Sequence, residues 1–158
     1  MIIRISVILL FTSIFVNFSK SASADCYSAP ANTIGTSGPC AGMLIVNFTM
    51  LQTAVNNRSY SISGPDFQSY TLADSDKNIF TGQLTSLENL FRFKRFNGDI
   101  NYWDVSNVTS LRTTFRDNNV FTGDISSWDV SNVTDMRETF RGAVFNGDIT
   151  SWDVSSVT

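Results

Sequence analysis

The chain has 158 residues, with 11 basic and 14 acidic side chains, a formal net charge of −3 and no histidine. This acidic balance disfavours a nucleic-acid-binding surface, and the lack of histidine removes the commonest general base and metal ligand. The class of protein must therefore be inferred from the pattern along the chain.

Residues 1–24 are typical of a secretory signal peptide. Arg4 supplies the positive charge, an apolar run extends from Ile5 to Phe18, and the small residues ending at Ala24 are typical of a cleavage site. The alternative, a membrane-spanning helix, is disfavoured because a bilayer core requires roughly 20 apolar residues. Cleavage near Ala24 would leave 9 basic and 14 acidic residues, a net charge of −5, in a chain long enough for one domain with a modest core.

The two cysteines, Cys26 and Cys40, follow the predicted cleavage site. In an exported chain we expect them to form a disulfide, which closes a loop of about 15 residues and is worth on the order of 3 kcal/mol. The alternative is two free thiols. A lipid anchor on Cys26 is disfavoured because Asp25 stands where a bacterial lipoprotein signal has a small residue.

Residues 25–78 are predicted to be an N-terminal cap. Residues 25–42, rich in Ser, Ala, Gly, Pro and Thr, are typical of a loop, and residues 43–57 carry apolar side chains at helical spacing. Residues 58–72 have the pattern of a hairpin that turns at Gly64-Pro65-Asp66. The helix and the hairpin would together cover the apolar end of whatever follows.

The second half of the chain is an internal repeat of 24 or 25 residues. The copies are FNGDINYWDVSNVTSLRTTFRDNNV (96–120), FTGDISSWDVSNVTDMRETFRGAV (121–144) and FNGDITSWDVSSVT (145–158), of which the third is incomplete. Residues 79–95 keep the same register in weaker form, with Ile79 in place of Trp103, so they are predicted to be a degenerate capping repeat.

Each copy has two halves of different periodicity. The half around the tryptophan suits a short extended segment, and the half from Val133 to Phe140 has the spacing of a short helix. The sequence therefore predicts an α/β solenoid of leucine-rich-repeat type, with one short parallel strand and one short helix per repeat and an N-terminal helix-plus-hairpin cap. The predicted repeat core is Trp103, Val105, Val108, Leu111, Phe115, Trp128, Val130, Val133, Met136, Phe140, Trp152, Val154 and Val157.

The run F-N-G-D-I-x-x-W-D-V-S-N-V-T-x-M-x-x-x-F resembles the repeat of the BspA-like leucine-rich-repeat surface proteins, a secreted and cell-surface group. The resemblance covers residues 96–158 strongly and 79–95 weakly. It implies adhesion to host or matrix proteins or to other cells. Because the third copy stops before its second half and would leave a sheet edge uncovered, we expect the chain to be a fragment of a longer array.

Two columns of aspartate follow the repeat. Asp99, Asp124 and Asp148 succeed the glycines and are weak calcium candidates, because Ca²⁺ favours clustered oxygen ligands. Asp104, Asp129 and Asp153 succeed the tryptophans. The alternative, which we favour, is that each aspartate accepts backbone N–H bonds in its own turn. Acid–base catalysis needs two carboxylates in unlike environments, and repetition makes the environments alike, so we expect no enzyme activity, no catalytic residue and no cofactor.

Arginines and tryptophans are the other candidates for binding. Arg92, Arg116 and Arg141, beside Arg112 and Arg137, could meet an anionic partner, or they form a solvated face neutralised by neighbouring carboxylates. Trp103, Trp128 and Trp152 would stack on sugars if they were exposed, but burial is favoured because Ile79 occupies the same position.

The sequence thus predicts a secreted or cell-surface repeat protein that binds an extracellular or matrix protein, or another cell surface, through the solenoid face. No nucleic-acid partner and no membrane span in the mature chain are expected. The alternative is a rigid spacer or a carbohydrate-binding module of a larger surface protein.

Overall fold

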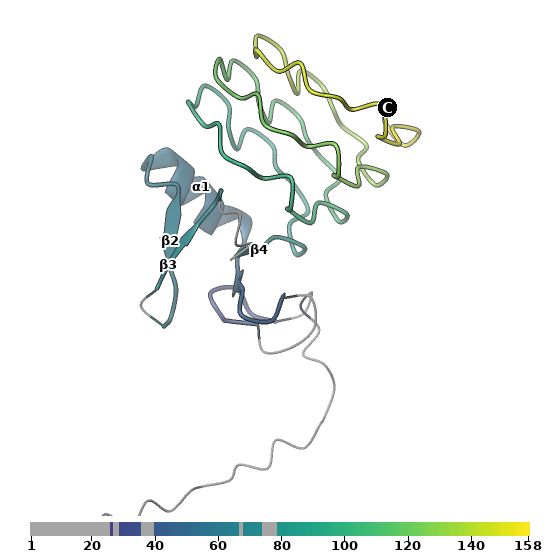
Figure 1. The fold of residues 1–158 in the computed structure, drawn as a ribbon. Coiled ribbons are helices and arrows are strands. Elements are labelled where there is room, and N and C mark those ends of the chain that lie inside the picture. The colour runs from purple at the N-terminus through teal and green to yellow at the C-terminus, as the bar shows by residue number, and fades with distance from the viewer. Residues whose placement is uncertain (1–25, 27–28, 36–39, 67, 74–78) are drawn as a thin grey trace, which may run out of the picture.

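Regular secondary structure is concentrated in the first half of the chain. The computed structural model describes residues 26, 29–35, 40–66, 68–73 and 79–158, so the predicted signal peptide lies outside the described residues. The elements are β1 (Leu44–Ile45), α1 (Phe48–Asn56), β2 (Ser61–Ser63), β3 (Ser69–Thr71) and β4 (Ile79–Phe80). In Figure 1, α1 and the β2–β3 hairpin lie beside the first turns of a stack of similar loops that continues to the C-terminus.

Helix α1 begins later than the sequence predicts. Leu44 and Ile45 form β1 instead, which pairs in parallel with Ile79 and Phe80 of β4, and all four side chains are buried. Asn47 then caps the helix, because its side-chain oxygen accepts the backbone N–H of Met50 at 3.0 Å. The first residues of the predicted helix are therefore part of the sheet that joins the cap to the repeats.

The hairpin lies where the sequence predicts it. Strands β2 and β3 pair antiparallel, with Ser63 opposite Ser69, on either side of the Gly64-Pro65-Asp66 turn. Tyr70 is buried in β3 and its hydroxyl donates to a carboxylate oxygen of Asp66 at 2.8 Å. Burial, followed by the contact with Asp66, raises the pKa of Tyr70 above its ordinary value.

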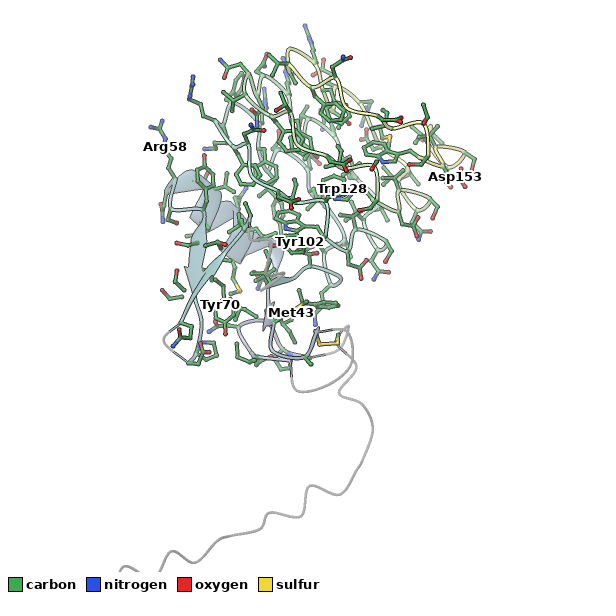
Figure 2. The ribbon with its side chains drawn as sticks, in the orientation of Figure 1. Met43, Arg58, Tyr70, Tyr102, Trp128 and Asp153 are labelled. Carbon is green, nitrogen blue, oxygen red and sulfur yellow. A yellow bond between two sulfur atoms is a disulfide. The ribbon has the colours of Figure 1, made fainter. Side chains whose placement is uncertain are left out.

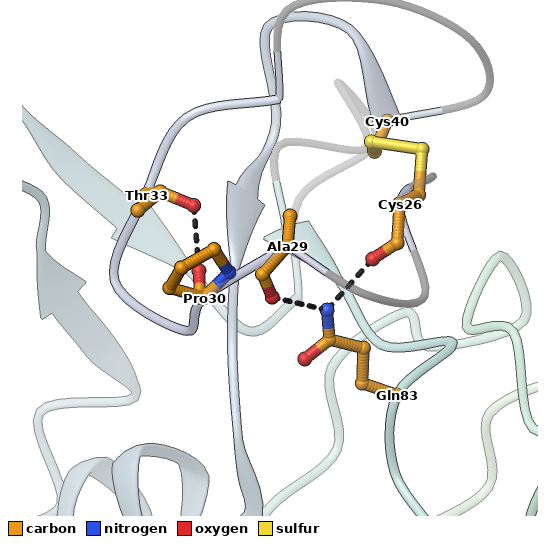
Figure 3. The surroundings of a disulfide bond; sticks show 6 residues. All are labelled: Cys26, Ala29, Pro30, Thr33, Cys40 and Gln83. Carbon is orange, nitrogen blue, oxygen red and sulfur yellow. Dashed lines mark hydrogen bonds between the residues drawn. A yellow bond between two sulfur atoms is a disulfide. The ribbon is translucent and has the colours of Figure 1, made fainter. Parts of the chain in front are cut away.

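The disulfide between Cys26 and Cys40 is confirmed, and it spans a sequence separation of 14. Both cysteines are buried and pack with Ile45 and Phe80 in a small apolar cluster. The side-chain amide of Gln83 donates to the carbonyl oxygens of Cys26 at 2.7 Å and Ala29 at 2.6 Å, as Figure 3 shows. The disulfide loop is thereby tied to the degenerate capping repeat.

From residue 81 onward the described chain contains no regular helix or strand; its copies are joined by isolated parallel bridges such as Ser110–Asp135. The short helices that periodicity favours are replaced by overlapping turns. Alternate N–H groups donate to carbonyls of the following copy. Most of the intervening ones donate three residues back, as Leu90 does to Leu87, and those of Glu88 and Arg112 donate to serine hydroxyls two residues back. A helix would need every N–H for its own ladder, so it cannot form here. The donors to the next copy are Leu87, Asn89, Phe91 and Phe93, then Leu111, Thr113, Phe115 and Asp117.

The interior of the array consists of aromatic columns. Phe115 stacks between Phe91 and Phe140, with ring centroids 5.4 and 5.6 Å away, and against Phe121 at 4.3 Å. Trp128 and Trp152 are also stacked, at 6.3 Å. One apolar cluster extends from α1 through these rings, so the cap and the copies share a core. Figure 2 shows side chains filling this stack between Tyr102 and Asp153.

Candidate binding surface

The aspartates that follow the glycines and tryptophans close turns. In each case a carboxylate oxygen accepts the backbone N–H two residues ahead, as Asp124 does from Ser126 at 2.8 Å and Asp148 from Thr150 at 2.9 Å. These backbone hydrogen bonds are the main reason that the pKa values of Asp124 and Asp148 lie below the ordinary value. The same contact occurs at Asp99, Asp104, Asp129 and Asp153.

These aspartates already accept hydrogen bonds from the protein's own donors, which bears on their candidacy as calcium ligands. Asp124 uses its second oxygen as well, because it accepts from the side-chain amide of Asn101 in the preceding copy at 3.1 Å. Within the described ranges, no group of three or more Asp, Glu, Cys or His side chains lies close enough to hold a metal ion. The protein's own donors therefore account for the geometry of these carboxylates.

The arginines of the repeats meet carboxylates along one face of the array. Arg112 lies 3.2 Å from Glu88 of the preceding copy, and Arg137 lies 2.6 Å from Asp135. Arg116 and Arg141 both contact Glu138, and Arg116 also contacts Asp117. We refer to these eight residues (Glu88, Arg112, Arg116, Asp117, Asp135, Arg137, Glu138 and Arg141) as the ion-pair face.

The ion-pair face is open to solvent. The side chains of Arg112, Arg137 and Arg141 are 48%, 68% and 63% exposed. Hydrogen bonds from the Arg137 side chain and backbone lower the pKa of Asp135 to about 2, and the Arg141 side chain lowers that of Glu138. Exposed pairs of this kind contribute little to stability, so the stack does not depend on them.

Arg92 differs from the other four arginines. It donates to the side chain of Asn89 at 3.3 Å, and its guanidinium lies 4.8 Å from the ring centroid of Phe93. No carboxylate among the described residues pairs with it. Phe93 is 63% exposed. Sequence reasoning missed Phe93, although the departure of its copy from the repeat pattern was a usable signal.

The tryptophans do not present their rings to solvent. Trp103 and Trp128 are 3% exposed and Trp152 is 9% exposed. Each indole N–H donates to a backbone carbonyl about one copy earlier, that of Leu72, Ile100 or Ile125. Burial and these hydrogen bonds make the tryptophans part of the packing between copies.

The rest of the predicted repeat core is mostly buried, with one correction. Met136, Phe140 and Val157 are partly buried, whereas Val154 is 50% exposed and does not belong to the core. Its counterparts Val105 and Val130 are each 1% exposed.

Buried polar side chains join the copies, Thr114, Thr139 and Asn118 among them, and sequence reasoning did not single them out. The Thr114 hydroxyl lies 2.7 Å from the carbonyl of Leu111 and 3.0 Å from that of Leu87. Thr139 makes the equivalent contacts one copy later. Asn118 donates to Phe96 and accepts the N–H groups of Val120 and Phe121. These side chains satisfy backbone groups that neither a helix nor a sheet satisfies here.

A cavity of about 350 Å³ opens on the cap, beside α1 and β2. It is lined by amides and hydroxyls, including Asn47, Thr53, Asn57 and Ser61, and by the apolar Met50 and Ile62. No titratable side chain lines it, so it offers no candidate acid or base.

Helix α1, with its nine residues, is the one helix that the described chain contains, and it is too short to span a membrane. No curated protein and no solved structure matched the chain. Residues 66–158, which include the hairpin's second strand and every copy of the repeat, match one family. The chain belongs to the family described as "Mycoplasma protein of unknown function, DUF285".

Proposed function

We propose that this chain is a secreted or cell-surface protein whose repeats form a solenoid of the BspA-like leucine-rich-repeat kind, and that it works by binding an extracellular protein. The binding surface is the ion-pair face. Affinity comes from many weak contacts along a regular array instead of from one deep pocket.

The observation that carries this proposal is the alignment of exposed charged side chains from successive copies. Glu88, Arg112 and Arg137 belong to three neighbouring copies, and the side chains of the two arginines are 48% and 68% exposed. Charges held in register by a rigid stack favour a partner with a complementary pattern, because complementarity of charge sets specificity and association rate.

The disulfide and the N-terminal sequence pattern support the assignment to the cell exterior. A disulfide joins Cys26 and Cys40, and disulfides persist in oxidising compartments. Together with the signal-peptide pattern of residues 1–24, this favours a secreted or surface location.

A second candidate is a rigid spacer, and the continuous core favours it, because the copies and the cap share one apolar cluster. A carbohydrate-binding module has less support. Sugar sites use exposed aromatic rings, whereas the repeat tryptophans are at most 9% exposed.

The test is binding of the full chain to immobilised collagen, laminin and fibronectin, measured by surface plasmon resonance. We expect saturable binding to at least one of them. Arg137→Gln should weaken that binding about two- to fivefold, as removal of an exposed interfacial charge does. Arg58→Gln, which removes an exposed arginine of the cap, is the matched control and should leave binding unchanged.

If the chain shows saturable binding to none of the three proteins, the adhesion proposal is wrong and the rigid spacer becomes the favoured function. Equal binding by Arg137→Gln and the unmodified chain would remove the ion-pair face as the binding surface.

A further inference from the structure

The turn formed by Arg92, Phe93, Lys94 and Arg95, which we call the basic-aromatic turn, stands apart from its counterparts. The equivalent residues are Arg-Asp-Asn-Asn at 116–119 and Arg-Gly-Ala-Val at 141–144. The backbone is equivalent in all three, because Phe93, Asp117 and Gly142 adopt φ values of 57°, 56° and 69°. Only the degenerate copy places an aromatic ring and three cations on this backbone.

Packing does not explain Phe93, and its exposed ring sets it apart more than its backbone does, because the array also holds Thr113 and Glu138 at positive φ, 53° and 57°. Positive φ favours glycine, asparagine and aspartate, and Asp117 and Gly142 follow that preference at the equivalent positions. Phe93 disregards it, and at 63% exposure it does not gain the burial that would compensate. The guanidinium of Arg92 lies 4.8 Å from the centroid of the Phe93 ring and makes a cation–π contact with it. A residue that satisfies neither local preference nor the core indicates a functional role.

The charge of the turn is also unbalanced. Arg116 and Arg141, which correspond to Arg92, are both paired with Glu138. In the described part of the chain, by contrast, no carboxylate forms an ion pair with Arg92, Lys94 or Arg95. Three cationic residues therefore flank Phe93 in the sequence of a chain whose net charge is −3, and one of them, Arg92, lies beside the ring.

We propose that the basic-aromatic turn docks the protein on an anionic lipid surface, which goes beyond the protein-binding function proposed above. The Phe93 ring would enter the boundary between headgroups and acyl chains, Arg92 would stay against the ring, and Lys94 and Arg95 would bind lipid phosphates. This is the arrangement in which long basic side chains reach headgroups while an aromatic ring lies deeper.

A lipid surface fits this turn better than an acidic protein does. Protein interfaces centre on side chains that fill pockets in well-packed patches, and the described cavity lies elsewhere, beside α1 and β2. A single ring on a short turn offers little area for such packing. A bilayer interface needs no complementary shape, only a ring to insert and cations to face its phosphates.

The first test is flotation of the full chain with vesicles of phosphatidylcholine alone and with vesicles of equal parts phosphatidylcholine and phosphatidylglycerol. The quantity measured is the ratio of binding to anionic over neutral vesicles, so an equal contribution from the N-terminal apolar segment cancels. Lys94→Ala with Arg95→Asn, which introduces the residues of the other copies, should lower this ratio about tenfold or more.

A matched pair of single variants controls for net charge. Arg95→Asn and Arg58→Asn each remove one exposed arginine, the first from the turn and the second from the cap. We expect Arg95→Asn to lower the ratio about fivefold and Arg58→Asn to leave it unchanged. Unaltered thermal unfolding would show that each variant is folded.

The second test places a reporter at the ring. In Phe93→Trp, the added indole should shift its emission to the blue on anionic vesicles and be quenched by brominated lipids, while the buried tryptophans supply a constant background. Val154→Trp, at a site 50% exposed in the last copy, should show neither effect.

Three results would overturn the proposal. One is equal binding to neutral and anionic vesicles, and another is a Phe93→Trp indole that stays unquenched. The third is salt-sensitive binding to poly-glutamate that depends on Lys94 and Arg95 with no vesicle binding, which would assign the turn to an acidic protein instead.

Discussion

The cap, residues 26–78, and the array, residues 79–158, hold their backbones in opposite ways. In the described part of the cap, α1 and the β2–β3 hairpin pair residues that are close in sequence, and a disulfide closes the loop before them. In the array, the N–H of Phe91 donates to Thr114 and that of Phe115 donates to Thr139, each in the next copy. The array therefore obtains its order from repetition, and the cap obtains its order from local structure.

The two regions meet at the β1–β4 pair. Leu44 and Ile45 of the cap lie in parallel with Ile79 and Phe80, where the array begins. The cap thus offers the first copy a parallel neighbour, as each copy does for the next. The difference teaches that a stacked repeat needs partner groups in register more than it needs a helix or a strand of its own.

The strongest test of this contrast is the pair Phe115→Ala and Leu51→Ala. Both side chains are fully buried, but Phe115 contacts rings of the copies on either side, whereas Leu51 lies in α1. We expect Phe115→Ala to lower the free energy of unfolding by about 3–5 kcal/mol and Leu51→Ala by about 2–5 kcal/mol. Urea denaturation followed by tryptophan fluorescence measures Phe115→Ala directly, since all three tryptophans lie in the array. It measures Leu51→Ala through the apolar cluster that Leu51 shares with them.

The shapes of the urea unfolding curves of Phe115→Ala and Leu51→Ala also distinguish the array from the cap. Phe115→Ala should expose Trp103, Trp128 and Trp152 together, because its ring links the aromatic columns. Loss of the Trp152 signal alone would show instead that the copies unfold independently, against the expectation of nearest-neighbour coupling.

A smaller effect is expected from Asn118→Ala. This side chain is fully buried, donates to the carbonyl of Phe96 and accepts two N–H groups, so its removal leaves buried backbone groups without partners. We expect a loss of about 2–3 kcal/mol in the free energy of unfolding. Asn119→Ala, at the exposed neighbouring position, is the matched control and should change it by no more than about 0.5 kcal/mol. Equal effects at the two positions would contradict the role of buried polar groups in joining the copies.

Much of the cap and of the periodic interior could be predicted from the sequence, because each rests on a local pattern. Gly64-Pro65-Asp66 marks the hairpin, and the close spacing of Cys26 and Cys40 in an exported chain indicates the disulfide. The recurrence of tryptophan at one position indicates packing between copies, because the same place is taken by Ile79.

The conformation of each copy could not be predicted in the same way. The spacing of Val133, Met136 and Phe140 is that of a helix, but successive turns with bonds three residues apart produce nearly the same spacing. What excludes the helix is the use of alternate N–H groups between copies, which no single copy reveals. Likewise, the local sequence predicts that Leu44 belongs to the helix, but its partner in β4, 35 residues away, places it in a strand.

The candidate site was foreseen in part. The arginines and their carboxylates were identified as one face, and the structure pairs four of the five. Phe93 was missed because it stands between Arg92 and Lys94 in a copy that departs from the repeat pattern. Val154 is more exposed than Val105 and Val130 at the same position of the repeat, a difference that periodicity alone does not show.

The smallest expected effect concerns pH and Asp135. Its pKa is lowered from 3.8 to about 2, first by the Arg137 side chain and then by the Arg137 backbone N–H. When a carboxyl has a lower pKa in the folded chain than in the unfolded chain, it stabilises the fold at pH values above its pKa in the unfolded chain. This stabilisation is lost as the pH falls through its pKa in the folded chain. The unmodified chain should therefore lose stability from Asp135 between about pH 4 and pH 2, and Asp135→Asn should show a shallower decline there. Arg137→Gln should lie between the two, because the backbone N–H still binds the carboxylate. Urea midpoints measured across this range give the three slopes, and a slope for Asp135→Asn as steep as that of the unmodified chain would assign the acid sensitivity to the other turn aspartates.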